Sequence, residues 1–227
     1  MGLGSLLAEL SAFGLAIGFS PIHIGLLLLL LLGPKPLQRG GWFVVGWLTT
    51  AALAVILLLT LGHGLLLSMD KGTSHRTGLD LIAAGALLGL GLKELWGTKE
   101  ESGPPGWTKK LESFCAMPLP LLLGFSGLLE VASPDDLFLF ANTAGSLLSA
   151  DLPHSQELLA TGLFSLVSGA LLLIPLLGLL LVGKDRVLPQ LEKGKSWLFD
   201  KGDLLVGLVS IGLALYLGWQ GIEGLQA

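Results

Sequence analysis

The stretch Val131-Ala-Ser-Pro-Asp-Asp-Leu-Phe-Leu-Phe140 places a proline and two adjacent carboxylates inside a long apolar run. A membrane-spanning helix needs about 20 apolar residues, and the run over 117–149 is more than half as long again. It therefore has room for two half-helices. Ser133 suits the N-cap of the second one, Pro134 its first position, and Asp135 and Asp136 its first turn. The sequence predicts a helix that restarts in mid-membrane.

The two aspartates allow two interpretations. Carboxylates inside a membrane are costly, and they usually face a cavity or a charged partner, which makes a binding site the first interpretation. In the second, both carboxylates only stabilise the start of the second half-helix through its dipole.

The composition identifies the class of protein. Of the 227 residues, 52% are hydrophobic and 13% are charged, which indicates an integral membrane protein without a soluble domain. The single Cys115 excludes a disulfide within the chain, a Cys-x-x-Cys redox pair and a thiolate metal cluster. No feature indicates nucleic-acid binding. The first apolar run is too long for a signal-peptide core and has no basic residue before it, so we expect a retained helix.

Apolar runs predict an all-α polytopic protein with six transmembrane helices. The spans are 3–32, 41–67, 79–96, 117–149, 158–182 and 204–222. Polar connections of differing length separate them. We expect Pro175 to kink the fifth span, and we expect the basic segment 184–201 to be either an interfacial segment or a solvated loop.

A weak internal repeat divides the chain into two halves. Asp80-Leu81, Gly89-Leu90 and Trp96 in the third span recur at the same spacing in the sixth span, and a Ser-Pro pair interrupts both the first span and the fourth. Three spans per half make the halves inverted with respect to each other. We therefore expect a first repeat over 1–97, a cytoplasmic connecting loop over 98–116 and a second repeat over 117–227.

The distribution of lysine and arginine predicts the orientation in the cell (plasma or inner) membrane, because cytoplasmic loops carry the excess of basic residues. With both termini outside, the external connections hold only Lys71 and Arg76 of the 13 basic residues. The inside connections hold the others: Lys35, Arg39, Lys93, Lys99, Lys109, Lys110, Lys184, Arg186, Lys193, Lys195 and Lys201.

The break in the first span contributes a second group of candidate residues. Ser20 and Pro21 predict a helix restart, and His23 then lies in its first turn. A helix N-terminus favours a neutral imidazole unless a carboxylate lies nearby. His23 either pairs with the aspartates of the other break or bonds a backbone carbonyl that Pro21 leaves unpaired.

Helical phase separates the two aspartates. At about 100° per residue, Asp135 shares one face with Asn142, Ser146 and Ser149, whereas Asp136 is turned away by roughly a quarter circle. We therefore expect Asp135 to be the main ion-binding carboxylate and Asp136 a dipole partner or cap.

Two further ionisable residues lie in or near the spans. Glu130, one turn before the break, either lines the approach or bonds backbone amides. His63 is interpreted as an interfacial residue rather than a ligand. The spacing of these groups matches no fixed metal motif, so the sequence leaves a metal site undetermined and predicts no cofactor.

The two breaks also carry a family resemblance. Gly18-Phe-Ser-Pro-Ile-His-Ile24, Gly46-Trp47-Leu48 and Ser133-Pro-Asp-Asp-Leu137, together with the order of six spans, resemble the glycopeptidolipid- and sulfolipid-addressing (GAP/Sap-like) family of the lysine-exporter (LysE) superfamily. The resemblance covers nearly the whole chain and implies lipid or glycolipid export. Family members typically have Ser-Pro-Ile-Pro-Ile and Asn-Pro-Lys-Asn at these breaks. Here His23 replaces the second proline and Asp135-Asp136 replace Lys-Asn, which shifts the expected preference toward a proton, a metal cation or an amine.

Three functions follow from these features. The first is a secondary transporter, an exporter with a carboxylate that binds a proton or cation at mid-membrane. The second is a non-catalytic scaffold or assembly factor whose loop 97–116 docks a partner. The third, a membrane enzyme, is not expected because no nucleophile–base pair or cofactor motif is present. The expected partners are the lipid bilayer and a small-molecule, ion or lipid substrate, and a homo-oligomer is left open.

Overall fold

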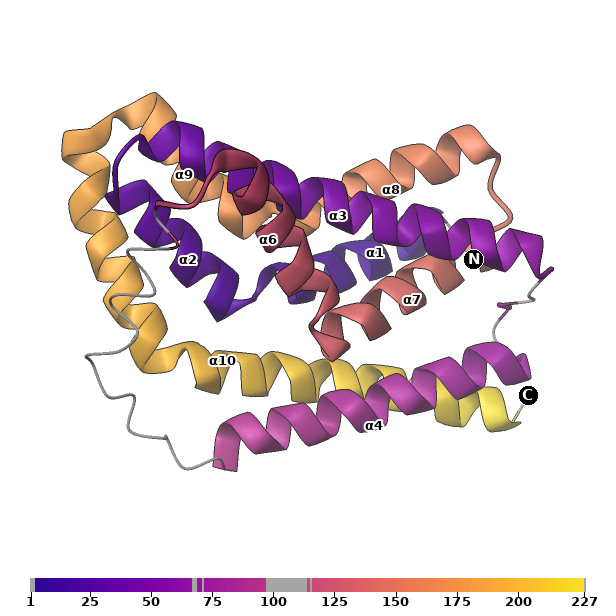
Figure 1. The fold of residues 1–227 in the computed structure, drawn as a ribbon. Helices are drawn as coiled ribbons and strands as arrows, with labels where there is room; N and C mark the ends of the chain where they lie inside the picture. The colour runs from indigo at the N-terminus through magenta and orange to yellow at the C-terminus, as the bar shows by residue number, and fades with distance from the viewer. Residues whose placement is uncertain (1–2, 67–68, 71, 97–113, 115, 227) are drawn as a thin grey trace.

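The structure is a computed structural model that describes residues 3–66, 69–70, 72–96, 114 and 116–226, and these residues form helices and no strand. The helices, in chain order, are α1 (Leu3–Gly18), α2 (Pro21–Leu32), α3 (Pro36–Gly64), α4 (Ser74–Trp96), α6 (Leu119–Val131), α7 (Pro134–Ser149), α8 (His154–Ser168), α9 (Ala170–Val182) and α10 (Lys184–Gln226). Both chain ends lie at the same end of the bundle (Figure 1).

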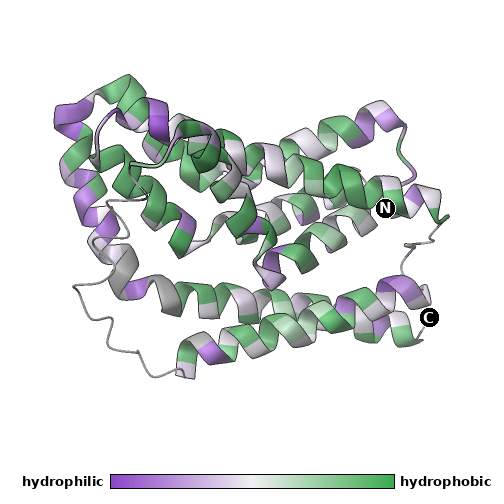
Figure 2. Ribbon diagram, in the orientation of Figure 1, coloured by the Kyte–Doolittle hydropathy of each residue, from purple (hydrophilic) through white to green (hydrophobic). Residues whose placement is uncertain are grey.

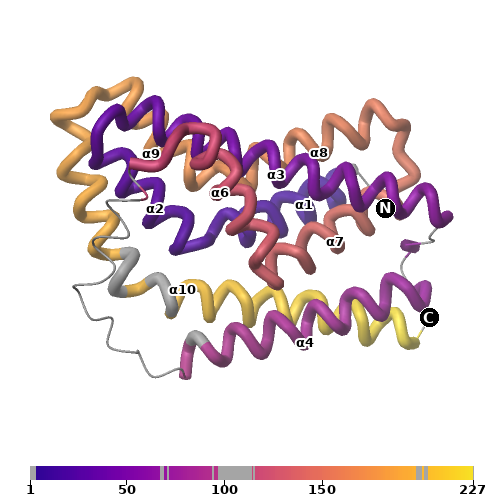
Figure 3. The backbone as a smooth tube through the Cα atoms, in the orientation of Figure 1, coloured from indigo at the N-terminus to yellow at the C-terminus, as the bar shows by residue number. Residues whose placement is uncertain are grey.

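Both predicted helix breaks are present. α1 ends at Gly18 and α2 begins at Pro21 with a bend of 62°, while α6 ends at Val131 and α7 begins at Pro134. Figure 3 shows the backbone leaving the helical path at these two places. The physical cause is local, because proline has no N–H to donate and disfavours helical dihedrals in the residue before it.

In the predicted fifth span the position of the bend is wrong, and for the basic segment 184–201 one of the two alternatives is excluded. The fifth span bends by 67° between α8 and α9, at Gly169, whereas Pro175 lies inside the continuous helix α9. The sixth span is the last part of a helix that already begins at Lys184, so the basic segment is helical rather than a solvated loop. Much of the connecting loop 98–116 lies outside the described residues.

The helices differ in how clearly they qualify as membrane spans. Among the described residues, α3 and the 204–226 part of α10 are each long and apolar enough to cross a membrane, and the bent pairs α1–α2 and α8–α9 qualify if each counts as one span. The charged α4 and the α6–α7 pair, which contains Glu130, Asp135 and Asp136, are not among these candidates. Length and composition therefore support two to four spans.

The bundle is apolar on its outside as well as in its core. The largest fully buried side chains include Trp47, Phe13 and Phe140, which come from three different helices. Leu53 and Leu57, one turn apart on α3, are 59% and 61% exposed. Hydrophilic residues concentrate at the ends of the bundle and at the break before α7 (Figure 2). This distribution is that of a membrane protein, whose lipid-facing surface is as apolar as its core.

Close helix contacts hold the bundle together. A Cβ on Gly46 of α3 would overlap the carbonyl oxygen of Leu123 in α6, so this crossing requires glycine. Ser165 Oγ donates to the carbonyl of Leu48 at 2.7 Å, and Trp47 Nε1 donates to Ser168 Oγ at 3.3 Å. Ser165 and Ser168 of α8 therefore make interhelical hydrogen bonds to α3, as small polar residues often do between packed membrane helices.

Candidate functional site

The two helix breaks have the same local construction. Ser20 and Ser133 have extended backbone dihedrals, and each precedes a proline at the start of the next helix. Neither serine makes the side-chain capping bond expected from its position. Instead, the hydroxyl of Ser20 is hydrogen-bonded to His23 Nδ1 at 2.8 Å, and the hydroxyl of Ser133 donates to Asp135 Oδ1. Each serine thus orients the polar side chain that follows its own break.

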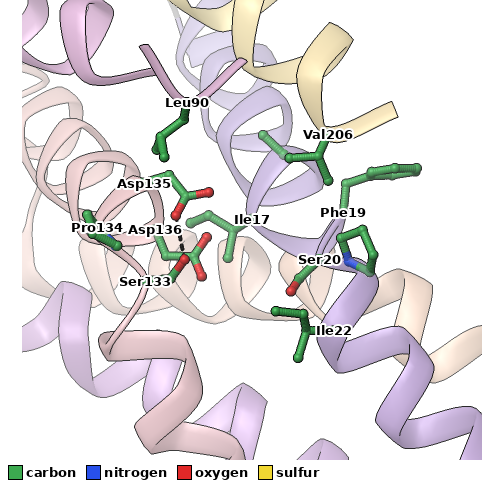
Figure 4. A pocket seen from close by; sticks show the side chains of 12 residues that line it. Ile17, Phe19, Ser20, Ile22, Leu90, Ser133, Pro134, Asp135, Asp136 and Val206 are labelled. Atoms are coloured by element: carbon green, nitrogen blue, oxygen red, sulfur yellow. Dashed lines mark hydrogen bonds between the residues drawn. The ribbon is translucent and has the colours of Figure 1, made fainter. Parts of the chain in front are cut away.

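A cavity of about 280 Å³ lies between the two breaks. One side is formed by the first break and the opposite side by the second, and Leu90 of α4 and Val206 of α10 close it (Figure 4). Its lining is Ala16, Ile17, Phe19, Ser20, Pro21, Ile22, Leu90, Ser133, Pro134, Asp135, Asp136 and Val206. The structure therefore brings together two segments that are far apart in the sequence.

Both aspartates line this cavity, although their positions around the helix predicted that the two side chains point in different directions. Asp136 is only 4% exposed, while Asp135 is half-buried. Asp135 also borders a second, smaller cavity of about 20 Å³ that extends toward Val209 and Ser210 of α10. Asp135 thus has the more open position, and Asp136 lies in the protein interior in the first turn of α7.

His23 is next to the cavity but does not line it. Its ring packs edge-on against Trp47 with the ring centroids 4.3 Å apart, and it is 3% exposed. Nε2 makes a long, 3.4 Å hydrogen bond to the carbonyl of Ser126 in α6. Because a carbonyl only accepts, Nε2 carries the proton, and the Ser20 hydroxyl can donate to Nδ1 of a neutral ring. The carbonyl partner is thus in the other half of the chain, not one released by Pro21.

Glu130 is completely buried and also lies outside the cavity lining. Neither of its carboxyl oxygens has a hydrogen-bond partner among the described residues. It interacts electrostatically with Asp136, and Asp136 interacts in the same way with Asp135. The predicted site residues therefore include a chain of three acids, and His23 of α2 contacts the carbonyl of Ser126, one helix turn before Glu130.

Comparison with known proteins agrees with the resemblance of the two breaks. Residues 10–223 match the family model described as "Sap, sulfolipid-1-addressing protein". The chain belongs to this family. No curated protein and no solved structure matches it significantly.

A buried ionic cluster in this Sap-family protein was not predicted. Arg76 of α4 is 2% exposed, and its guanidinium contacts Glu9 of α1 at 3.0 Å and Asp80 at 3.2 Å. Arg76 Nη1 and Glu9 Oε1 also bond the hydroxyl of Ser146 in α7. We expected Arg76 in an external connection, and this is wrong because Arg76 lies buried within α4. The Arg-x-x-x-Asp spacing within α4 and a lone glutamate in the first span were the available signals.

Asn142 belongs to this ionic cluster rather than to the cavity of the Sap-family protein. The side-chain nitrogen of Asn142 donates to the backbone carbonyl of Phe138 at 2.9 Å. The backbone carbonyl of Asn142 accepts a hydrogen bond from Arg76 Nη1 at 3.5 Å. The polar face predicted for this helix therefore runs from Asp135 at the cavity to Ser146 at the cluster.

Proposed function

We propose that this Sap-family protein is a secondary transporter that exports its substrate by binding a proton or cation at the acids of the break between α6 and α7. The observation that carries this proposal is the cavity between the two breaks, with Asp135 and Asp136 on its wall. The family description and the apolar helices support a membrane protein of a lipid-addressing family.

The proposed architecture is six spans in two inverted repeats, with residues 1–97 and 117–227 as the halves, as in the lysine-exporter superfamily. The contacts between helices support it. α1 packs on α8, and α6 packs on α3, so the first span of each half contacts the second span of the other. α4 packs on α7 and α10 on α2, which is the same exchange for the third spans. α4 and α10 also pack on each other, as expected near a twofold axis.

The three acids supply the chemistry of the proposed coupling. Glu130 and Asp136 are buried beside each other in a medium of low dielectric constant, and two carboxylates there need a shared proton or a cation. Asp135, at the more open position, would exchange that proton or cation with the cavity. His23 would act as the neutral link to the first break. The substrate is then carried across the membrane if the cavity between the two breaks opens alternately to the two sides of the membrane.

The family description favours a lipid as the transported substrate, and one side of the cavity suits it. Ile17, Phe19, Leu90 and Val206 contribute apolar side chains to the cavity lining. A cavity of about 280 Å³ accommodates part of an amphipathic molecule, with its polar group near the acids. We propose the cell membrane as the location, with both termini outside, because most basic residues then face the cytoplasm.

The test is transport in proteoliposomes that contain the purified protein. Proton movement is followed with an entrapped pH-sensitive dye, and lipid movement with headgroup-labelled lipids that an impermeant reductant quenches. Panels of cations, amines and lipids are supplied in turn. Asp135→Asn and Asp136→Asn remove one carboxylate each, and Asp151→Asn makes the same change at an exposed residue of the α7–α8 connection.

We expect wild type and Asp151→Asn to transport equally, and we expect Asp135→Asn to lose at least tenfold in rate for the coupled substrate. Equal rates for wild type and Asp135→Asn with every active substrate would refute the site. No flux above that of empty liposomes for any substrate would refute the transporter.

A further inference from the structure

A second group of chemically active side chains lies at the end of the bundle where the chain termini lie. His63 is in the last turn of α3, while His154 and Glu157 are in the first turn of α8. These two helix ends lie close together in Figure 1. None of the three residues lines the cavity between the breaks.

Glu157 connects the two histidines. Its Oε1 lies 2.9 Å from His63 Nε2, and its Oε2 lies 3.1 Å from His154 Nδ1. The two imidazole rings are edge-to-face with centroids 5.6 Å apart. One ligand atom from each of the three residues can be chosen so that all lie within 4.8 Å of one another. The three side chains therefore converge on one point.

The backbone around the cluster holds this geometry. Gly62 precedes His63, and a Cβ there would overlap the side chain of Leu148 in α7, so the end of α3 packs closely on α7. The connection from α7 to α8 is short and turns at Asp151, which has a φ of 47°. The start of α8 is thereby kept beside the end of α3.

We propose that His63, His154 and Glu157 form a binding site for a transition-metal ion of the zinc type. Imidazole nitrogen with one carboxylate oxygen is a donor set that zinc accepts, whereas calcium and magnesium require oxygen ligands throughout. Ligands at about 2.0 to 2.1 Å from a tetrahedral ion are about 3.3 Å apart. The donor atoms here lie within 4.8 Å of one another, so side-chain rotation must bring them closer on metal binding.

The exposure of the three residues also suits a metal site. The Glu157 side chain is 6% exposed and anchors the base of the site, while His63 at 45% and His154 at 85% stay accessible from outside the protein. Water can then supply a fourth ligand. A bound ion would join the end of α3 to the start of α8. This site is independent of the proposed transport site.

The test is metal binding by the chelator-treated protein in detergent, purified without a polyhistidine tag. Zinc affinity is measured by competition with a chromophoric chelator, and cobalt serves as the spectroscopic probe of coordination. The variants are His63→Gln, His154→Gln and Glu157→Gln. The matched control is His75→Gln, which removes an exposed histidine of α4 outside the cluster.

We expect one zinc ion per chain for wild type and for His75→Gln, with the intense visible absorption of four-coordinate cobalt. Each cluster variant should bind at least tenfold more weakly and lose that absorption. His154 is almost fully exposed, so its variant keeps the fold even if Glu157→Gln does not, and size-exclusion elution checks this. Wild-type affinity in His63→Gln and His154→Gln, or an equal loss in His75→Gln, would overturn the proposal.

Discussion

Replacing Arg76 by methionine tests whether the buried ionic cluster joins α1, α4 and α7. The substitution keeps an unbranched side chain but removes the contacts to Glu9 at 3.0 Å and Asp80 at 3.2 Å. It leaves two carboxylates whose side chains are 2% and 3% exposed. Removing one partner of a buried ion pair costs about 3 to 5 kcal/mol. Arg76→Met should therefore lower the free energy of unfolding by about that amount.

The measurement is reversible unfolding in mixed micelles, followed by near-ultraviolet circular dichroism during titration with a denaturing detergent. At about 1.4 kcal/mol per factor of ten, the expected loss corresponds to at least a hundredfold change in the unfolding equilibrium. Arg186→Met is the control, because Arg186 is exposed and should change stability by less than about 0.5 kcal/mol.

A compensating variant separates the charge effect from lost packing. Glu9→Gln and Asp80→Asn, combined with Arg76→Met, neutralise the two carboxylates that Arg76 contacts. This triple variant should recover at least about 2 kcal/mol, since an uncompensated charge accounts for most of the cost. If Arg76→Met unfolds within about 0.5 kcal/mol of wild type, or if the triple variant is less stable still, the cluster does not stabilise the bundle as reasoned.

Two further predictions concern helix packing. Gly46→Ala should destabilise the protein by about 1 to 3 kcal/mol in the same unfolding assay, because the added Cβ would overlap the Leu123 carbonyl. Gly41→Ala is the control: a Cβ there meets open space, so this variant should be neutral or stabilising. Equal effects of the two alanines would contradict the close crossing. Trp47→Phe should cost about 1 to 3 kcal/mol, because it removes a hydrogen bond to Ser168 and buried ring area, and an unchanged midpoint would show that this contact contributes nothing.

The family and the breaks could be predicted because their signals are local. A proline affects the hydrogen bonding and dihedrals of its immediate neighbours, so Ser20-Pro21 and Ser133-Pro134 were sufficient to place two helix restarts. The bend at Gly169 was missed because Pro175 has the stronger local signal, and packing decided which position bends.

Partners across the bundle could not be predicted. Helical phase describes a side chain relative to its own helix, so it separated Asp135 from Asp136 without showing that one cavity receives both. For the same reason, the sequence did not predict that Arg76 pairs with Glu9 or that His63 pairs with Glu157, because the two residues of each pair are far apart in the sequence.

The sequence by itself determined the class of protein, its two broken helices and the acids beside them, because hydropathy, proline geometry and helix-start preferences act over a few residues. Only the tertiary structure decided which charged groups meet. A buried charge is stabilised by whatever group the packing of the helices brings within a few ångströms, and that neighbour can come from any part of the chain.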